Sequence, residues 1–209
     1  SAKFAVVSKS PLTNRINDSL ASSHFAIAGK ACGCDAIVLV GQATAPTILV
    51  IDDGHVRLED AGSIWGMEIP PAETELHQRF DDDFRWAVIG PAGERLVRYA
   101  TISHDRRHAG RGGSGAILGS KNVKAIGVRG GQRTTWANPQ ALIRLSKELS
   151  RKSFGPATAK YRELGTASNL LTFNRFHALP TRNFQQGSFT GAAALSPEQL
   201  GTIYSKTQA

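Results

Sequence analysis

The chain has 209 residues, of which 41% are hydrophobic and 20% are charged, a globular composition that can supply one sizeable core or two smaller ones. No apolar run approaches the roughly 18 residues of a membrane-spanning helix, and the first ten residues lack the pattern of a secretory signal. The formal net charge of +8 is compatible with a polyanionic partner, which could be nucleic acid, anionic lipid or a phosphorylated cofactor. Most of the charges are scattered, however, and outside the patch of Arg106, Arg107 and Arg111 an ordinary solvated surface is favoured.

The first half of the chain is predicted to form short strands with few helices. Helices are expected at residues 19–31, where apolar residues recur at helical spacing, and at residues 71–80, which follow a Pro-Pro pair. The continuous apolar run at residues 35–41 predicts a buried strand. Asp53-Gly54 predicts a tight hairpin turn because Asp-Gly supplies positive φ. The predicted strands are residues 4–8, 35–41, 47–51, 55–59, 86–90, 96–103 and 125–128.

After Gly130-Gly131 the sequence predicts helices, at residues 138–150, 161–173 and 196–204. Strands followed by helices favour an α+β fold, with a β-rich domain over residues 1–132 and the start of an all-α domain over residues 133–209. Because the first residues already form a strand-like run, we expect this sequence to be a fragment of a longer protein.

The most informative segment is a glycine-rich stretch at residues 104–122. Closely spaced glycines let a backbone approach a ligand and aim its N–H groups at it, and arginines add donors that match phosphate oxygens. The stretch therefore predicts an anion site, with a flexible loop and solvated arginines as the alternative. It is neither a Walker loop, because Gly119-Ser120-Lys121 has the wrong spacing, nor a dinucleotide fingerprint, because no acidic residue follows about 20 positions on. The residues concerned are Arg106, Arg107, Gly110, Arg111, Gly112, Gly113 and Gly115, beside His104 and His108.

Other chemically capable residues have simpler interpretations. Cys32 and Cys34 are too few for a zinc or iron–sulfur site, so we expect buried reduced thiols and a cytoplasmic location. His24 could act as a catalytic acid, but a surface or core histidine is the better expectation. The acidic run at residues 81–83 could bind a cation, although a solvated loop is favoured.

Three segments, at residues 9–13, 33–38 and 109–126, together resemble the aldehyde:ferredoxin oxidoreductase family, as do shorter ones at residues 64–66, 89–94 and 183–185. The resemblance implies a tungsten (or molybdenum) ion held by two pterins, whose phosphates are bridged by Mg²⁺, beside a [4Fe-4S] cluster. It also implies oxidation of aldehydes to carboxylic acids, with ferredoxin as the electron acceptor. The N-terminal domain of such a protein is the α+β base on which the pterins lie.

The resemblance also assigns roles to single residues. Arg107 falls at a pterin-phosphate arginine, and Lys3 at a second arginine position, where lysine keeps the charge but loses the forked geometry. His108 and Leu20 fall at the magnesium positions, where each offers its backbone carbonyl. Ser22 falls where some members have glycine. The full set of implied cofactor contacts is Lys3, Leu20, Ser22, Arg107, His108, Gly110, Arg111, Gly112, Gly113 and Gly115.

The same resemblance places the cluster cysteines and the catalytic residues outside these 209 residues, so we expect no catalytic residue here and no activity from the chain alone. A homodimer of the full-length protein is compatible with it. One alternative is a family scaffold with a lost or different low-potential redox activity. Another is a basic anion-binding or nucleic-acid-binding module, which we disfavour because the basic residues lack interleaved aromatic platforms. We expect neither a nucleic-acid nor a membrane partner.

Overall fold

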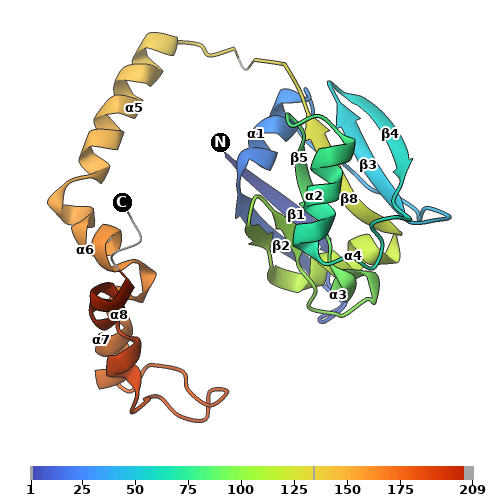
Figure 1. Ribbon diagram of the computed structural model, residues 1–209. Coiled ribbons are helices and arrows are strands. Elements are labelled where there is room, and N and C mark those ends of the chain that lie inside the picture. The colour runs from blue at the N-terminus through green and yellow to red at the C-terminus, as the bar shows by residue number, and fades with distance from the viewer. Residues whose placement is uncertain (1, 134, 205–209) are drawn as a thin grey trace. The chain divides into compact units, whose positions relative to one another are not determined.

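The computed structural model describes residues 2–133 and 135–204. The chain divides into two compact units, Ser1–Thr135 and Trp136–Ala209 (Figure 1). Among the described residues, the first unit holds all of the strands, whereas the second holds helices and one isolated β-bridge, between Thr181 and Gln186. The expected α+β class is therefore confirmed, while the assignment of the first unit as a tungstopterin-binding domain stays a prediction.

Two sheets make up the first unit. A ribbon of two antiparallel strands comprises β1 (Lys3–Lys9) and β2 (Ile16–Ser22). The second sheet has six strands in the order β4-β3-β8-β5-β6-β7, antiparallel throughout except for the parallel pair β3 and β8. Its strands are β3 (Thr47–Asp52), β4 (His55–Asp60), β5 (Arg85–Val88), β6 (Ile102–His104), β7 (Arg107–Ala109) and β8 (Val123–Arg129).

Both faces of the six-stranded sheet are covered. Helix α2 (Ile69–Arg79) packs on one face, where Leu76 and Trp86 belong to one buried apolar cluster (Figure 1). The other face packs against the β1–β2 ribbon, helix α1 (His24–Ala31) and helix α4 (Ser114–Ser120) in a second cluster. Alternate residues of β3 enter the two clusters, as the period-two geometry of a strand requires. The short helix α3 (Pro91–Glu94) precedes β6.

A buried ion pair links three parts of the first unit. The Lys124 side chain has no solvent exposure, and its ammonium pairs with the Glu94 carboxylate, which is 5% exposed. Lys124 Nζ also donates to the Met67 carbonyl at 2.8 Å, and the second oxygen of Glu94 accepts from the Gly66 N–H at 2.9 Å. Strand β8, helix α3 and the turn at residues 64–67 are thereby tied together.

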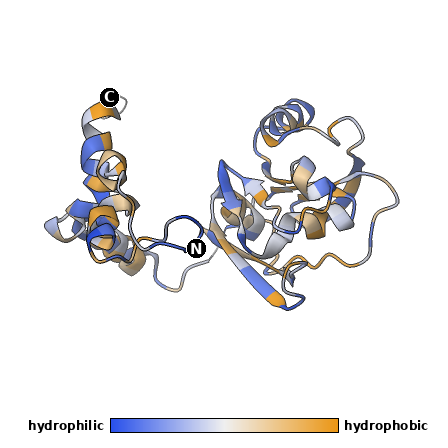
Figure 2. Cartoon of the chain, turned by 90° about the horizontal axis from the view of Figure 1, so that it is seen from below, coloured by the Kyte–Doolittle hydropathy of each residue, from blue (hydrophilic) through white to orange (hydrophobic). Residues whose placement is uncertain are grey.

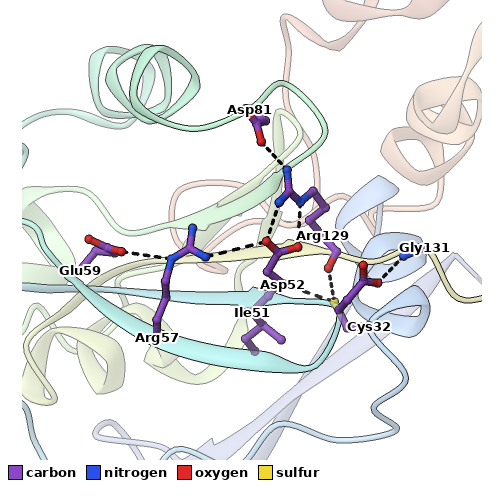
Figure 3. Close-up of polar contacts among 9 residues, drawn as sticks. Cys32, Ile51, Asp52, Arg57, Glu59, Asp81, Arg129 and Gly131 are labelled. Atoms are coloured by element: carbon purple, nitrogen blue, oxygen red, sulfur yellow. Dashed lines mark hydrogen bonds and ion pairs between the residues drawn. The ribbon is translucent and has the colours of Figure 1, made fainter.

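A second polar network lies at the carboxyl end of β8 (Figure 3). The Arg129 guanidinium donates to both carboxylate oxygens of Asp52 and to Asp81, and it stacks 4.6 Å from the centre of the Phe84 ring. These hydrogen bonds from Arg129 hold the pKa of Asp52 below its usual value. The acidic run at residues 81–83 therefore contributes one carboxylate to a structural ion pair.

Over its described residues, 136–204, the second unit contains four helices and two short 3-10 turns. The Asn138 side chain accepts from the Ala141 N–H at 2.9 Å and so caps the first helix. Hydrophilic and hydrophobic residues alternate along these helices (Figure 2). The elements are α5 (Pro139–Ser153), α6 (Pro156–Leu164), η2 (Thr166–Asn169), α7 (Leu170–Arg175), η3 (Ala192–Leu195) and α8 (Pro197–Tyr204).

Several predicted elements are confirmed. The hairpin of β3 and β4 turns at Asp53 and Gly54, whose φ values are 46° and 84°. Helices α2, α5 and α8 lie where they were expected. The helical stretch predicted at residues 161–173 is also confirmed, but it is divided, because Gly165 (φ 66°, ψ −163°) ends α6 and the chain continues as η2 and α7. The predicted strand at residues 96–103 is largely wrong, since β6 begins only at Ile102.

Two other predictions are wrong because they depend on which strands pair with one another. Residues 19–31 were expected to be helical, but Ile16–Ser22 forms β2 and the helix begins at His24. Residues 35–41 were expected to be a buried strand, yet they form none, and Val38 and Val40 are 80% and 89% exposed. Only Leu39 packs against the core. Among the described residues, no strand pairs with this apolar segment.

Across residues 2–133 and 135–204, no helix combines the length and the apolar character needed to cross a membrane.

Candidate functional site

The glycine-rich stretch is an ordered hairpin followed by a helix. Strand β6 turns into β7 through Asp105 and Arg106, whose φ values of 45° and 59° make a tight two-residue turn. The Asp105 carboxylate accepts from the Phe25 N–H at 3.1 Å, which anchors the turn to the start of α1. The chain then forms the 3-10 turn η1 (Arg111–Gly113) and enters α4. The alternative of a flexible glycine loop is therefore not supported.

Three glycines of the stretch are explained by close packing of backbone on backbone. A Cβ added to Gly113 would lie 2.0 Å from the Arg98 carbonyl oxygen, and φ there is +75°. A Cβ on Gly115 would lie 2.4 Å from the Thr101 carbonyl oxygen, and the Gly115 N–H already donates to Ala100 at 2.9 Å. A Cβ on Gly119 would lie 2.0 Å from the carbonyl oxygen of Gly93. These glycines shape the site by allowing the helix to pack.

Gly112 differs from the other three because its neighbour is a side chain. Its φ is +74°, and a Cβ there would lie 2.0 Å from Nδ2 of Asn17 on β2. The Asn17 amide also donates to the Arg111 carbonyl oxygen at 3.2 Å, and Ser19 Oγ accepts from the Arg111 N–H at 3.1 Å. Strand β2 is therefore bonded directly to the glycine-rich stretch.

A hollow of about 490 Å³ lies where β2 meets β7 and η1. It brings together four of the residues that the sequence assigned to a cofactor site, from two segments that are almost 90 positions apart. Seven residues line the hollow: Asn17, Asp18, Ser19, Leu20, His108, Gly110 and Arg111. Of the other predicted contacts, Lys3 and Ser22 are direct partners across the β1–β2 ribbon, on the same face as Leu20. Gly113 and Gly115 are buried below the surface.

The cationic side chains of this region have no anionic partner of their own. Within the described part of the chain, no hydrogen bond or ion pair engages the side chains of Lys3, Arg107 or Arg111. Arg107 and His108 lie exposed on β7. A phosphate group entering the hollow would meet one guanidinium that is not already neutralised, that of Arg111. Asp18 also lines the hollow, whereas Arg107 is not among its lining residues.

His104, which the sequence placed beside the basic residues of the anion site, is buried. His104 has no solvent exposure, and its Nδ1 lies 2.8 Å from Ser23 Oγ. Its ring packs edge-on against Phe4 at 4.8 Å between centroids, while Nε2 has no hydrogen-bond partner among the described residues. Burial lowers the pKa of His104, against the opposing effect of the neighbouring Asp105. His104 is therefore neutral at pH 7. His104 is the last residue of β6, and no pattern in the sequence indicated that it is buried.

The remaining sequence candidates lie elsewhere. His24 is an exposed residue at the start of α1. Cys32 is buried, as expected, and its thiol donates to the Arg129 carbonyl at 3.0 Å (Figure 3). Burial raises the pKa of this thiol. Cys34 is also a free thiol but is only partly buried. Across the described residues, no group of three or more His, Cys, Asp or Glu side chains could hold a metal ion.

These observations decide how a pterin cofactor would fit. The unpaired arginines and the hollow suit phosphate groups, whereas the Arg111 and Gly115 N–H groups are already used within the protein. Arginine side chains would thus supply positive charge that these two backbone amides cannot. A magnesium ion would need backbone carbonyl and phosphate oxygens, because the described side chains offer no cluster of three ligands.

Comparison with known proteins identifies the family of the chain. A family model described as the aldehyde ferredoxin oxidoreductase N-terminal domain matches residues 1–130. The chain is 36% identical over 209 residues to the tungsten-containing aldehyde ferredoxin oxidoreductase of Pyrococcus furiosus, covering 97% of this chain and 34% of that protein. The protein of the same name from Pyrococcus abyssi is 37% identical with the same coverage. The chain thus spans about a third of the length of these relatives.

Two further relatives carry other names. The chain is 32% identical over 200 residues to a protein of Pyrococcus furiosus named aliphatic sulfonate oxidoreductase, WOR-like subunit, with coverage of 88% of this chain and 32% of that one. Among solved structures, the active site complex BamBC of benzoyl coenzyme A reductase matches with a TM-score of 0.69 and 31% identity, over 71% of this chain and 23% of that chain. With the family model matched over 130 residues, the chain belongs to the aldehyde ferredoxin oxidoreductase family and contains its N-terminal domain.

Proposed function

We propose that this chain is the cofactor-binding base of a tungstopterin oxidoreductase that converts aldehydes to carboxylic acids and passes electrons through a [4Fe-4S] cluster to ferredoxin. The observation that carries the proposal is the hollow, in which Leu20, His108, Gly110 and Arg111 meet. The names of the relatives, which include tungsten and ferredoxin, support the choice of cofactor and electron acceptor.

The proposed role of this chain is binding rather than chemistry. Arg107 and Arg111 would bind pterin phosphates, and Lys3 would contribute a further positive charge from the far end of the ribbon. The backbone carbonyls of Leu20 and His108 would be the protein ligands of a magnesium ion. The bound tungsten centre would supply the two-electron chemistry. A cluster in the whole protein would take its cysteine ligands from outside these 209 residues, since Cys32 and Cys34 are engaged in the fold and number only two.

The decisive experiment is metal and pterin analysis of the full-length gene product after expression with both tungstate and molybdate. We expect about one tungsten or molybdenum and two pterins per polypeptide. Arg107→Gln and Arg111→Gln should each lower the pterin content, whereas Arg144→Gln, on the exposed surface of α5, should not. A product that contains neither metal nor pterin would contradict the proposal.

A second candidate is another low-potential reduction on the same scaffold. The observation that favours it is that two similar proteins are named for aliphatic sulfonate and for benzoyl coenzyme A rather than for aldehydes. Assays of the metal-loaded protein with aldehydes, sulfonates and aromatic thioesters, using a low-potential dye, separate the two candidates. Turnover of aldehydes with no other substrate class supports the first.

A nucleic-acid-binding module remains the disfavoured alternative. It predicts affinity for arbitrary oligonucleotides that falls steeply between 50 and 200 mM salt, by about a thousandfold or more for six phosphate contacts. Absence of binding at about 50 mM salt would remove it.

A further inference from the structure

The peptide of Arg111 is held at both ends by side chains from a distant strand. Ser19 Oγ accepts a hydrogen bond from the Arg111 N–H at 3.1 Å, and Asn17 Nδ2 donates to the Arg111 carbonyl oxygen at 3.2 Å. Asn17 and Ser19 are two positions apart on β2 and therefore point to the same side of the ribbon. The backbone N–H and carbonyl of Arg111, which could otherwise pair with a neighbouring strand, are thus both bonded to side chains of β2.

This double contact lies where the chain leaves β7 and enters η1. Gly112 follows immediately in the left-handed region, with φ +74°, and the Asn17 amide fills the space that a side chain at this position would need. Ser19 is 2% exposed, so its hydrogen bond is shielded from water. The path of residues 110–112 is consequently fixed in part from β2, in addition to the contacts within the glycine-rich stretch itself.

We propose that Asn17 and Ser19 are positioning residues of the phosphate site, which hold the Arg111 peptide so that its guanidinium is presented to the hollow. The inference rests on the proposed function. Arg111 has no side-chain partner among the described residues, so only its backbone is restrained by the protein. Fixing the backbone of a free arginine reduces the number of conformations lost when an anion binds.

The probe is inorganic pyrophosphate with Mg²⁺, titrated into the 209-residue chain by calorimetry. Ser19→Ala and Asn17→Ala should each weaken binding about three- to tenfold, because each removes one hydrogen bond to the Arg111 peptide. Ser19→Thr keeps the hydroxyl and should restore most of the affinity. The matched control is Ser8→Ala, since Ser8 pairs with Asn17 across the ribbon and its buried hydroxyl has no partner among the described residues.

Two readouts separate positioning from a general structural effect. Amide hydrogen exchange of Arg111 should accelerate in Ser19→Ala and stay unchanged in Ser8→Ala. In an Arg111→Gln background, Ser19→Ala should cause little further loss of affinity, because the side chain that it positions is gone.

The pyrophosphate titrations distinguish failure of the positioning role from failure of the proposed function. If the wild-type chain binds pyrophosphate and Ser19→Ala binds it equally well despite faster exchange at Arg111, the positioning role is wrong while the proposed function stands. Equal additional losses in the wild-type and Arg111→Gln backgrounds also contradict positioning. If the wild-type chain does not bind pyrophosphate at all, the anion site of the proposed function fails, and the positioning role fails with it.

Discussion

Removal of the buried ammonium of Lys124 should destabilise the first unit strongly. In Lys124→Met the Glu94 carboxylate keeps only the Gly66 N–H as a partner, inside a region where it is 5% exposed. Breaking one half of a buried ion pair costs about 3–5 kcal/mol, because the remaining charge is left uncompensated. For a unit of this size, that loss corresponds to a fall in Tm of roughly 10–15 °C.

Urea and thermal unfolding followed by circular dichroism measure this effect. The double variant Lys124→Met with Glu94→Leu should recover most of the lost stability, since replacing a whole buried pair by apolar side chains is often close to neutral. The control is Lys152→Met on α5, whose pair with Glu148 is 64% and 45% exposed and should contribute less than about 0.5 kcal/mol. A loss below about 1 kcal/mol for Lys124→Met would refute the reasoning, as would a double variant no more stable than the single one.

Two other predictions concern the packing at Gly119 and the protonation of the buried His104. Gly119→Ala should reduce the free energy of unfolding by more than about 2 kcal/mol, because its Cβ would lie 2.0 Å from a backbone oxygen of Gly93. The control is Gly29→Ala, which has no atom within 4 Å of its added Cβ and should stabilise the protein by about 0.5–1 kcal/mol. Similar urea midpoints for the two variants would refute the packing argument. Because burial lowers the pKa of His104, the unfolded chain takes up the proton first, so stability should fall as the pH drops below about 6.5. In His104→Gln, the free energy of unfolding should depend less steeply on pH between about pH 7.5 and 5.5. Urea unfolding at several pH values measures this, and an equally steep dependence in the variant would contradict the lowered pKa of His104.

Local signals in the sequence predicted the parts of the fold that depend on local geometry. The Asp53-Gly54 turn was predictable because two adjacent residues need positive φ. The proline pair at Pro70 and Pro71 marked the start of α2 in the same way. The anion site was predictable in outline, since four of its residues do line one hollow.

The errors came from contacts between distant segments. The alternation along Ile16–Ser22 marks a strand, but its small apolar residues also fit a helix, and only pairing with β1 decides between them. The apolar run at residues 35–41 indicated burial, yet a run cannot indicate which strand it pairs with. The roles of Asn17 and Ser19 depend on hydrogen bonds that span 94 and 92 positions, so no local pattern could predict them. Gly115 was assigned to ligand approach, whereas backbone packing explains it.

The strand order has a consequence for how the first unit is made. Strand β8 is the last strand in the chain, but it lies in the middle of the sheet between β3 and β5. During synthesis the β3–β4 hairpin is complete well before β8 emerges, by roughly 3–12 s at translation rates of 5–20 residues per second. Until then β3 has one open edge and β5 lacks its inner partner. The sheet can therefore be completed only after β8, its central strand, has been synthesised.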